Sequence, residues 1–338
     1  MSIHVGINGF GRIGRNFFRA ARKRGADIDI VAVNDIGSVD TMAHLLRYDS
    51  VFGRLDDDVQ VADDGIKVGG DSFKVLSVRD PKELPWGDLG VDVVVESTGI
   101  FSSREQAAMH LDAGAPYVIV SAPSKGADAT FVPGVNEDTF DPAQHKVVSN
   151  ASCTTNCFVP MVKVLDDAFG VERGLMTTVH AYTGDQMLVD GPHKDQRRAR
   201  AAAINIVPTS TGAARATGLV LDAMQGRLDG QSLRVPVVDG SLTDFTAVLA
   251  REASVDEVNE AFRAASGSGR LASPLLDYSD APLVSTDIVG SSASCTFDSL
   301  LTQAIGNLVK VFGWYDNEWG YSQRLVDLAL IVGAANQK

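Results

Sequence analysis

The N-terminal part of the chain alternates short apolar runs with amphipathic stretches. Apolar runs at residues 3–7, 29–35, 91–98, 117–123 and 146–150 predict β-strands, and their valine-rich character is typical of strands buried on both faces. Residues 12–24 and 103–114 predict helices between these strands, the second beginning at Ser103 and ending near Gly114. This alternation predicts an α/β fold in which a doubly wound, mostly parallel Rossmann-type sheet has helices on both faces.

Other segments depart from this alternation. Residues 54–75 combine alternating polarity with glycine-containing turns, which predicts an antiparallel insertion with a solvated acidic turn. In the C-terminal half, residues 242–252 and 307–316 predict strands, and residues 322–335 predict an apolar-faced helix. Residues 254–265 predict another helix, whose first turn carries the capping box Ser254 and Glu257.

Composition restricts the class of protein. The chain has 338 residues with 45% hydrophobic and 22% charged residues, which is ordinary for a globular protein of two domains and excludes general disorder. The formal net charge of −13 argues against a general nucleic-acid binder, but a local basic cluster could still bind a small anion. Three cysteines cannot build a disulfide framework and suit a reducing compartment. We see no secretory signal and no 18-residue apolar run, so we expect a cytoplasmic protein.

A glycine-rich turn joins the first predicted strand to the first predicted helix. Gly9, Gly11 and Gly14 have the G-x-G-x-x-G spacing, and Asp35 ends the next strand about 20 residues later. Such a turn brings backbone and a helix N-terminus to a pyrophosphate, while the acid binds a ribose hydroxyl. The motif therefore predicts dinucleotide binding. A carboxylate at Asp35 would repel a 2′-phosphate, which favours NAD over NADP.

The segment "SNASCTTNC", residues 149–157, places Cys153 where a loop enters a predicted helix. A helix N-terminus stabilises a thiolate, so Cys153 is a candidate nucleophile. Cys157 lies one turn further on, and we interpret it as a buried thiol. The C-x-x-x-C spacing is not the redox spacing, and no second Cys/His pair predicts zinc, so we expect no metal.

Cys153 needs a base, and six histidines are available. His180 is the best candidate because it follows the strand-like run "LMTTV" and begins the polar segment "HAYTGDQ". A histidine beside a thiol can lower the thiol pKa and move protons. Taken alone, His180 could equally be structural.

A basic cluster stands out in an acidic chain. Arg197, Arg198 and Arg200 occur together, "VPTSTGAA" follows with Thr211 and Gly212, and Arg234 lies further on. Hydroxyls, backbone N–H groups and guanidinium groups are the donors that recognise phosphate or sulfate. A subunit contact or surface salt bridges are the alternative interpretation.

Taken together, these segments resemble the glyceraldehyde-3-phosphate dehydrogenase family over essentially the whole chain. The segments that carry the resemblance are "GINGFGRIGR" (6–15), "SNASCTTNC" (149–157), "HAYTGDQ" (180–186), "RRARAAAINIVPTSTGAA" (197–214) and "WYDNEWGYS" (314–322). Their order matches the phosphorylating bacterial type. The related erythrose-4-phosphate dehydrogenases typically depart at "PTSTGAA", which is intact here.

The resemblance implies a role for each matching residue. Cys153 would be the nucleophile and His180 its partner. The expected NAD-binding residues are Gly9, Gly11, Arg12, Ile13, Gly14, Asp35, Arg79, Ser121 and Asn317, the last holding the nicotinamide carboxamide. The residues expected around the substrate phosphate are Thr183, Asp185 and Arg234. The residues expected around inorganic phosphate are Ser152, Thr154, Arg198, Thr211 and Gly212, with Arg200 as an alternative that orients the loop.

The resemblance also implies the reaction, the domains and the assembly. The expected reaction is phosphorylating, NAD-dependent oxidation of glyceraldehyde 3-phosphate to 1,3-bisphosphoglycerate through a Cys153 hemithioacetal and thioester, in glycolysis or gluconeogenesis. An erythrose-4-phosphate dehydrogenase, a non-catalytic NAD-binding scaffold and a thiol acyltransferase or hydrolase remain alternatives. We expect an NAD-binding domain at 1–152, with the helix at 318–338 packing back on it, and an α+β catalytic domain at 153–317 with a largely antiparallel sheet. A homotetramer is implied.

One departure from the family pattern is visible near Arg234. Val238 stands where the family usually has proline, and Asp239 where it has a small or neutral residue. An acid there would weaken anion binding if it pointed inward. We expect Asp239 to face solvent.

Overall fold

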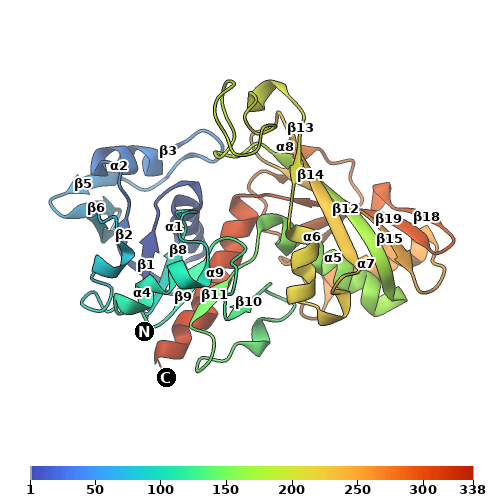
Figure 1. The fold of residues 1–338 in the computed structure, drawn as a ribbon, viewed down its shortest axis with the longest axis horizontal. Coiled ribbons are helices and arrows are strands. Elements are labelled where there is room, and N and C mark those ends of the chain that lie inside the picture. The colour runs from blue at the N-terminus through green and yellow to red at the C-terminus, as the bar shows by residue number, and fades with distance from the viewer. Residues whose placement is uncertain (1, 338) are drawn as a thin grey trace. The chain divides into compact units, whose positions relative to one another are not determined.

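The structure is a computed structural model that describes residues 2–337, and it divides into two compact units. Unit 1 comprises the chain up to Phe131, Asn136–Ala151 and the residues from Ser322 on, and unit 2 comprises Val132–Val135 and Ser152–Tyr321. Figure 1 shows β1 (Ile3–Asn8) in blue and α9 (Trp319–Gly333) in red, and residues 3–8 and 322–333 of these elements both belong to unit 1. No helix within residues 2–337 is long and apolar enough to cross a membrane.

Unit 1 is built on one mixed sheet. From edge to edge its strands are β10 (Ala129–Thr130), β11 (Val147–Ser149), β9 (Val118–Val120), β8 (Val93–Glu96), β1 (Ile3–Asn8), β2 (Ile28–Asn34), β7 (Asp71–Leu76), β6 (Gly65–Val68) and β5 (Val59–Ala62). All neighbouring pairs from β10 to β7 are parallel. The expected antiparallel insertion is confirmed in β5, β6 and β7, but β7 also pairs with β2 and so extends the parallel sheet.

Helices cover both faces of this sheet. They are α1 (Arg12–Arg24), α2 (Val39–Arg47), α3 (Arg104–Ala107), α4 (Met109–Asp112) and α9 (Trp319–Gly333), while β3 (Tyr48–Asp49) and β4 (Gly53–Arg54) form a separate hairpin. Successive residues of a strand point to opposite faces. In β1, Ile3 meets Gly333 of α9 on one face, whereas Gly6 meets Trp86 on the other. The doubly wound arrangement expected from the sequence is therefore present.

Unit 2 is built on a second, largely antiparallel sheet. Its strands in spatial order are β13 (Val207–Ser210), β14 (Leu228–Val235), β12 (Val171–Ala181), β15 (Ser241–Leu249), β19 (Leu308–Tyr315), β17 (Cys295–Asp298) and β16 (Leu276–Ser279), with β18 (Gln303–Ile305) paired to β19. The helices of this unit are α5 (Cys153–Phe169), α6 (Ala213–Ala216), α7 (Val255–Gly267) and α8 (Ser285–Ile288). Among the described strands of this sheet, only the pairs β12–β14 and β16–β17 are parallel.

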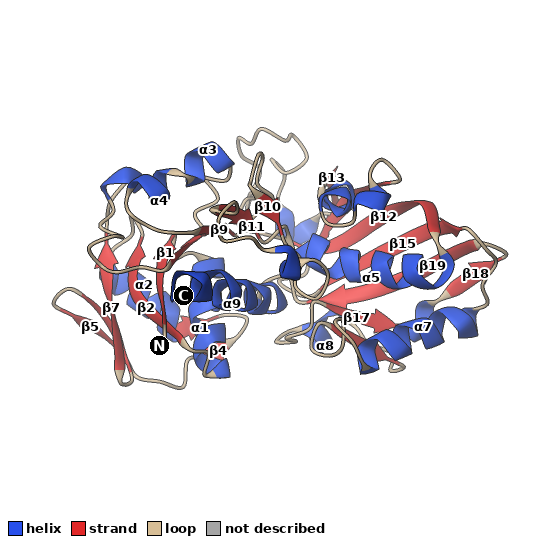
Figure 2. Cartoon of the chain, turned by 90° about the horizontal axis from the view of Figure 1, so that it is seen from below, coloured by secondary structure: helices blue, strands red, loops and turns tan. Residues whose placement is uncertain are grey.

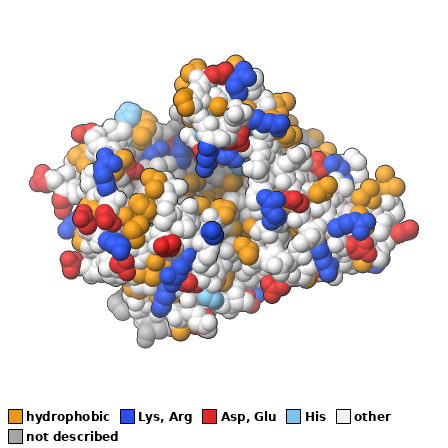
Figure 3. Space-filling view, viewed as in Figure 1, with side chains coloured by type: hydrophobic (Ala, Val, Ile, Leu, Met, Phe, Trp, Pro, Cys, Tyr) orange, Lys and Arg blue, Asp and Glu red, His pale blue; other side chains and the backbone are white. Residues whose placement is uncertain are grey.

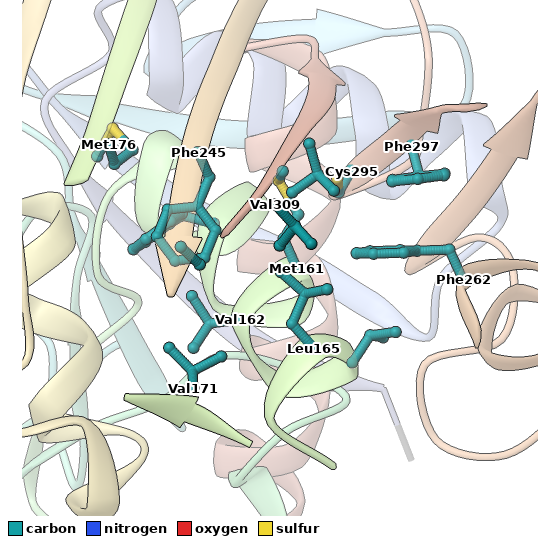
Figure 4. Close-up of a cluster of buried hydrophobic side chains, with 14 of the residues drawn as sticks. Met161, Val162, Leu165, Val171, Met176, Phe245, Phe262, Cys295, Phe297 and Val309 are labelled. Atoms are coloured by element: carbon teal, nitrogen blue, oxygen red, sulfur yellow. The ribbon is translucent and has the colours of Figure 1, made fainter. Parts of the chain in front are cut away.

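The core of unit 2 lies between this sheet and the helices α5 and α7, which Figure 2 shows over one face of it. Met161, Val162 and Leu165 of α5 have the i, i+1, i+4 spacing of one helix face and are fully buried. Figure 4 shows the Phe262 ring of α7 lying flat against Phe297 of β17, with ring centroids 3.8 Å apart. The capping box of Ser254 and Glu257 is confirmed at the start of α7. This core fixes α5, and with it the position of Cys153.

Candidate functional site

The glycine-rich turn of unit 1 lies where the strand order reverses. The chain runs from β1 to β2 and β7 on one side and then returns to β8 on the other, so the carboxyl ends of β1 and β8 flank a topological switch point. Gly9 has φ +93°, and a Cβ there would lie 2.6 Å from the Thr98 nitrogen. A Cβ at Gly14 would lie 2.3 Å from the Gly9 oxygen. Both positions therefore require glycine to bring helix, turn and β8 together.

The N-terminus of α1 is open to an anion. Gly11 is the N-cap, no side chain caps the helix and no acidic residue lies in its first turn. A Cβ at Gly11 would meet nothing within 4 Å, so this glycine faces free space. Backbone N–H groups at the positive end of a helix suit a pyrophosphate. The turn therefore fits a dinucleotide, as its spacing predicts.

Asp35 follows β2 at the same edge of the sheet. Its Oδ2 accepts the Phe10 N–H at 2.8 Å and its Oδ1 accepts the Gly37 N–H at 3.0 Å, which orients the carboxylate beside the glycine turn. Arg12 donates to Asp49 at 2.8 Å, and Ile13 is half-buried. Arg79 is exposed after β7, and Ser121 follows β9 with its N–H on the Glu96 oxygen. The Ser121 N–H is thus bonded to β8 and not to the turn.

A buried polar network, which no sequence motif predicts, supports this edge of the sheet. The Glu96 carboxylate accepts Asn8 Nδ2 at 2.6 Å, and Asn34 Nδ2 donates to Asn8 Oδ1 at 2.7 Å. Trp86 Nε1 donates to His110 Nδ1, so Nε2 of a neutral His110 carries the proton that Glu96 accepts at 3.0 Å. The available signal was that Asn8, Asn34 and Glu96 each end an apolar strand at this edge.

In unit 2, Cys153 is the first residue of α5, as the sequence predicts. Ser152 is the N-cap, and its Oγ accepts the Thr155 N–H at 3.0 Å. Backbone N–H groups at this helix start, including that of Thr154, act on the Cys153 sulfur and favour its anionic form. Part of the Cys153 side chain is accessible, whereas Cys157 is fully buried with Sγ 3.5 Å from the Gly313 oxygen. Cys157 is thus a packed thiol.

His180 lies beside Cys153. Its Nε2 is 3.5 Å from Cys153 Sγ, and its Nδ1 is 2.7 Å from the Ala181 carbonyl oxygen. The carbonyl can only accept, so Nδ1 carries the proton of the neutral ring and Nε2 is free to accept the thiol proton. Burial is the largest cause that raises the pKa of Cys153 to about 11 and lowers the pKa of His180 to about 3. The resting pair is therefore a neutral thiol and a neutral imidazole.

Tyr315 fixes the position of α5 relative to β12, and no local sequence pattern singles it out. Its hydroxyl lies 2.7 Å from Thr154 Oγ1 and 2.8 Å from Thr178 Oγ1, so it links α5 to β12 from the end of β19. Its ring meets the His180 ring edge-on at 5.9 Å. A buried Tyr hydroxyl that joins two strands and a helix depends on the fold and has no local signature.

Anion-binding groups lie next to His180. Arg234 of β14 is its neighbour in the parallel β12–β14 register and donates to Thr183 Oγ1 at 2.7 Å. The Arg234 Nε is buried and has no hydrogen-bond partner in the described part of the chain. Thr183 in turn donates to Asp185. Burial opposes ionisation of Asp185, but the Thr183 hydrogen bond and the charges of Arg198 and Arg234 lower its pKa overall.

Only one arginine of the "RRAR" segment contacts these groups. Arg198 donates to Asp185 Oδ2 at 2.5 Å and to Thr209 Oγ1 at 2.9 Å. Arg197 is exposed, and Arg200 pairs with Asp190 at 2.8 Å within the loop. The geometry thus places Arg198, and not Arg197 or Arg200, with the candidate phosphate site.

The remaining predicted phosphate residues differ in availability. Thr211 Oγ1 accepts the Ala213 N–H at 3.2 Å, and Gly212 precedes the short helix α6. Ser152 Oγ lies 2.7 Å from Thr155 Oγ1. Thr154 is only 4% exposed and its hydroxyl lies 2.7 Å from the Tyr315 hydroxyl. Both its side chain and its backbone N–H act on the Cys153 sulfur.

Asn317 lies directly after β19 and is buried. Its Oδ1 accepts Ser241 Oγ at 2.6 Å, which fixes the amide so that its Nδ2 is the free donor group. Our expectation for Asp239 is wrong: the side chain is 1% exposed and does not face solvent. Its neighbour Val238 takes the exposed position. The chain turns at Gly240 against Ser285, and this packing buries Asp239, which the local pattern could not indicate.

Comparisons with known proteins agree with this geometry. Residues 3–104 match the family model described as glyceraldehyde 3-phosphate dehydrogenase, NAD binding domain, and residues 152–317 match that of the C-terminal domain. Glyceraldehyde-3-phosphate dehydrogenase 1 of Streptomyces avermitilis is 60% identical over 334 residues, covering 98% of this chain and 99% of the relative. The enzyme of Mycobacterium avium is 60% identical over 339 residues, with the same coverage. Among residues 2–337 no cluster of His, Cys, Asp or Glu is arranged to hold a metal ion.

Proposed function

Because this chain belongs to the glyceraldehyde-3-phosphate dehydrogenase family, we propose that it oxidises D-glyceraldehyde 3-phosphate and couples the oxidation to phosphorylation, giving 1,3-bisphosphoglycerate. It is an NAD-dependent oxidoreductase. The observation that carries the proposal is the Cys153–His180 pair, 3.5 Å between sulfur and Nε2, with the partly unsatisfied Arg234 beside it. A nucleophile, a base and an anion site are the groups this reaction needs.

The first step is addition of Cys153 to the aldehyde carbon. The thiol proton passes to His180 Nε2 as the C–S bond forms, because Nδ1 is held as a donor to Ala181. The imidazolium then donates to the new oxyanion. The backbone N–H groups at the start of α5, which act on the Cys153 sulfur, are expected to stabilise the same charge. Proton return to oxygen gives a neutral hemithioacetal.

In the second step, His180 removes the hemithioacetal hydroxyl proton while a hydride leaves the carbon, which gives a thioester on Cys153. NAD supplies the hydride acceptor. Gly9, Gly11, Arg12, Ile13 and Gly14 would hold its pyrophosphate end and Asp35 its ribose. Arg79, Ser121 and Asn317 complete the proposed set. Inorganic phosphate then attacks the thioester, releasing the acyl phosphate and the Cys153 thiolate, which recovers its proton from solvent or from the imidazolium.

Two groups of residues would bind the phosphates. Thr183, Asp185 and Arg234 form a connected set for the substrate phosphate, in which the buried Arg234 Nε lacks a partner. Arg198, Ser152, Thr154, Thr211 and Gly212 are the proposed set for inorganic phosphate. Guanidinium groups bind phosphate oxygens in a paired geometry, which suits both sets.

The proposed NAD-binding domain is 1–152 together with the C-terminal segment 318–338, which contains α9, and the proposed catalytic domain is 153–317. A homotetramer fits the exposed apolar side chains of the loop before β13, where Leu188 is 82% and Ile204 is 79% exposed. We propose that the enzyme works in the cytoplasm, in glycolysis or gluconeogenesis.

The test is the rate of NADH formation from glyceraldehyde 3-phosphate and NAD, with and without inorganic phosphate. We expect sustained turnover only with phosphate and a single stoichiometric burst without it, because the thioester then stalls. Cys153→Ala should abolish both, whereas the matched Cys157→Ala should retain both since that thiol is buried away from solvent. Equal sustained rates without phosphate would contradict the phosphorylating reaction. Turnover with erythrose 4-phosphate alone would identify that substrate instead.

A further inference from the structure

Two carboxyl groups are buried together beyond the end of the β15–β19 ladder. Ser241 opposite Tyr315 is the last pair of this antiparallel ladder, so the residues before Ser241 run alongside those after Tyr315. Asp239 and Asp316 lie in these two segments, and each is 1% exposed. Carboxyl groups are rarely buried unless a cation or a shared proton compensates their charge.

Asp316 has the donors that a carboxylate needs. Its Oδ2 accepts the Gly290 N–H at 2.7 Å, and its Oδ1 accepts the N–H groups of Glu318 at 2.9 Å and Trp319 at 2.6 Å. Asp239 has one such donor, the Gly240 N–H on Oδ1 at 2.9 Å. Its Oδ2 is buried without a partner at ordinary hydrogen-bond distance among residues 2–337. The Asp316 side chain is close enough to act on the Asp239 carboxyl group.

The surrounding charges oppose a second anion. The acidic groups that act on Asp239 are Asp316 and Glu318, and the nearby helix α8 contributes Asp287, which accepts the Val284 N–H. Burial, followed by the charges of Asp316 and Glu318, raises the pKa of Asp239 to about 9. The pKa of Asp316 rises to about 6, mainly because this carboxyl group is buried. At neutral pH the pair therefore keeps one proton, which resides on Asp239.

Both acids are close in sequence to one hydrogen bond of the proposed cofactor site. Asp316 immediately precedes Asn317, and Asp239 lies two residues before Ser241, whose Oγ donates to Asn317 Oδ1 at 2.6 Å. The intervening Gly240 has φ +84°, and a Cβ there would lie 2.3 Å from the Ser285 oxygen. The segment is thus packed too tightly to move Asp239 away from Asp316 without moving Ser241.

We infer that Asp239 is a positioning residue: the proton it shares with Asp316 holds Asn317 in the orientation that binds the nicotinamide carboxamide. This inference rests on the role of Asn317 given under Proposed function. When the proton is lost to solvent, two buried anions repel each other, the Asp316–Glu318 turn shifts and Asn317 no longer presents its amide. Binding of the nicotinamide half of the cofactor therefore weakens in alkali.

The experiment compares the wild type with Asp239→Asn, whose amide imitates the protonated acid, and uses the exposed Asp229→Asn as the matched control. Kd is measured from pH 7 to pH 10 for NADH, which is stable in alkali, and for ADP-ribose, which lacks nicotinamide. Since about one-tenth of the pair keeps its proton one pH unit above its midpoint, the wild-type Kd for NADH should rise about tenfold by pH 10. Asp239→Asn should show no such rise, Asp229→Asn should follow the wild type, and ADP-ribose should bind without this pH dependence.

Thermal unfolding of the same proteins tests whether the folded form holds an extra proton on the Asp239–Asp316 pair. A folded-state pKa raised above the unfolded value means that the folded form holds an extra proton, so its stabilising effect is lost as pH rises towards 9. The Tm of the wild type should fall relative to Asp239→Asn between pH 6 and pH 9. A Tm difference between the wild type and Asp239→Asn that does not change with pH would overturn the inference. So would a wild-type Kd for NADH that does not change with pH, and this result can be obtained without any variant.

The two readouts separate this inference from the proposed function. If NADH fails to bind even at pH 7, the cofactor role of Asn317 is wrong, and with it the positioning role of Asp239. If NADH and ADP-ribose weaken equally in alkali, the nicotinamide is not the affected group and the inference is also wrong. Loss of NADH affinity confined to the wild type and Asp229→Asn supports it.

Discussion

At the scale of single residues, the chemistry of this protein depends on which nitrogen of His180 carries a proton. The Ala181 carbonyl oxygen, 2.7 Å from Nδ1, selects the tautomer that leaves Nε2 towards Cys153. Arg234 adds a second influence, because its charge favours the thiolate but disfavours the imidazolium. The pair is thus neutral at rest and becomes charged only as the sulfur attacks.

Replacing His180 with asparagine should separate catalysis from binding. Loss of a general acid–base group typically slows a reaction by ~100- to 10,000-fold, so we expect kcat to fall within that range. The Kd for NAD should stay unchanged, because His180 contacts Cys153 and Ala181 and not the glycine turn. Pre-steady-state NADH formation measures the first effect and equilibrium titration the second. His4→Asn, a half-exposed histidine of unit 1, is the control and should turn over normally; near-normal turnover of His180→Asn would refute its role.

At the scale of elements, each predicted chemical group stands where a helix or strand ends. Cys153 begins α5, His180 lies one residue before the end of β12, and the glycine turn joins β1 to α1. At a helix start the backbone N–H groups have no partner within the helix and all point along the helix axis, whereas N–H groups in the middle of a helix are already bonded. Two glycines of the turn serve different purposes: Gly14 allows close packing, and Gly11 leaves space at the helix start.

Gly11 and Gly14 should respond differently to alanine. A Cβ at Gly14 would lie 2.3 Å from the Gly9 oxygen, so Gly14→Ala should destabilise unit 1 and lower its unfolding midpoint. A Cβ at Gly11 would meet no protein atom within 4 Å, so Gly11→Ala should fold normally but crowd the cofactor, raising the Kd for NAD by about tenfold, or ~1.4 kcal/mol. Calorimetry and NAD titration on both variants check this contrast. Unchanged NAD affinity in a well-folded Gly11→Ala would show that the pyrophosphate does not bind at this helix start.

At the scale of the whole molecule, charge is dispersed while the site is locally cationic. Acidic and basic side chains are interspersed on the face shown in Figure 3, and the net charge of −13 is therefore not one continuous acidic patch there. Arg234 and Arg198 lie beside a buried neutral pair, where desolvation strengthens their field. Because His180 is buried in its neutral form, the free energy of unfolding should decrease in acid.

We expect His180 to contribute to acid unfolding. Its folded-state pKa of about 3 lies below the ordinary 6.5, so between these values the unfolded chain binds a proton that the folded one excludes. Stability is then fully present above pH 6.5 and decreases as pH falls towards 3, by up to about 1.4 kcal/mol per pH unit for one proton. Urea unfolding of the wild type and His180→Asn at pH 7 and pH 4.5 tests this, with His4→Asn as the control. An equal loss of stability in all three proteins would contradict a buried neutral His180.

Much of this protein follows from local sequence patterns. Valine runs, the capping box at Ser254 and the glycine spacing determined the strands, α7 and the turn, because each depends on neighbours within a few residues. The position of Cys153 at a helix start followed in the same way. Its pairing with His180 could be proposed from residue types, but the 3.5 Å separation depends on α5 packing against the sheet of unit 2.

Only the tertiary structure decided the rest. Tyr315 bonds both Thr154 and Thr178, although it follows each of them by more than 130 residues. The Glu96 network joins the ends of three strands. Asp239 was expected on the surface because acids usually lie there, yet the turn at Gly240 packs against Ser285 and buries it against Asp316. Burial and shared protons arise from contacts between segments that are distant in sequence, and such contacts produce no periodic pattern of residues.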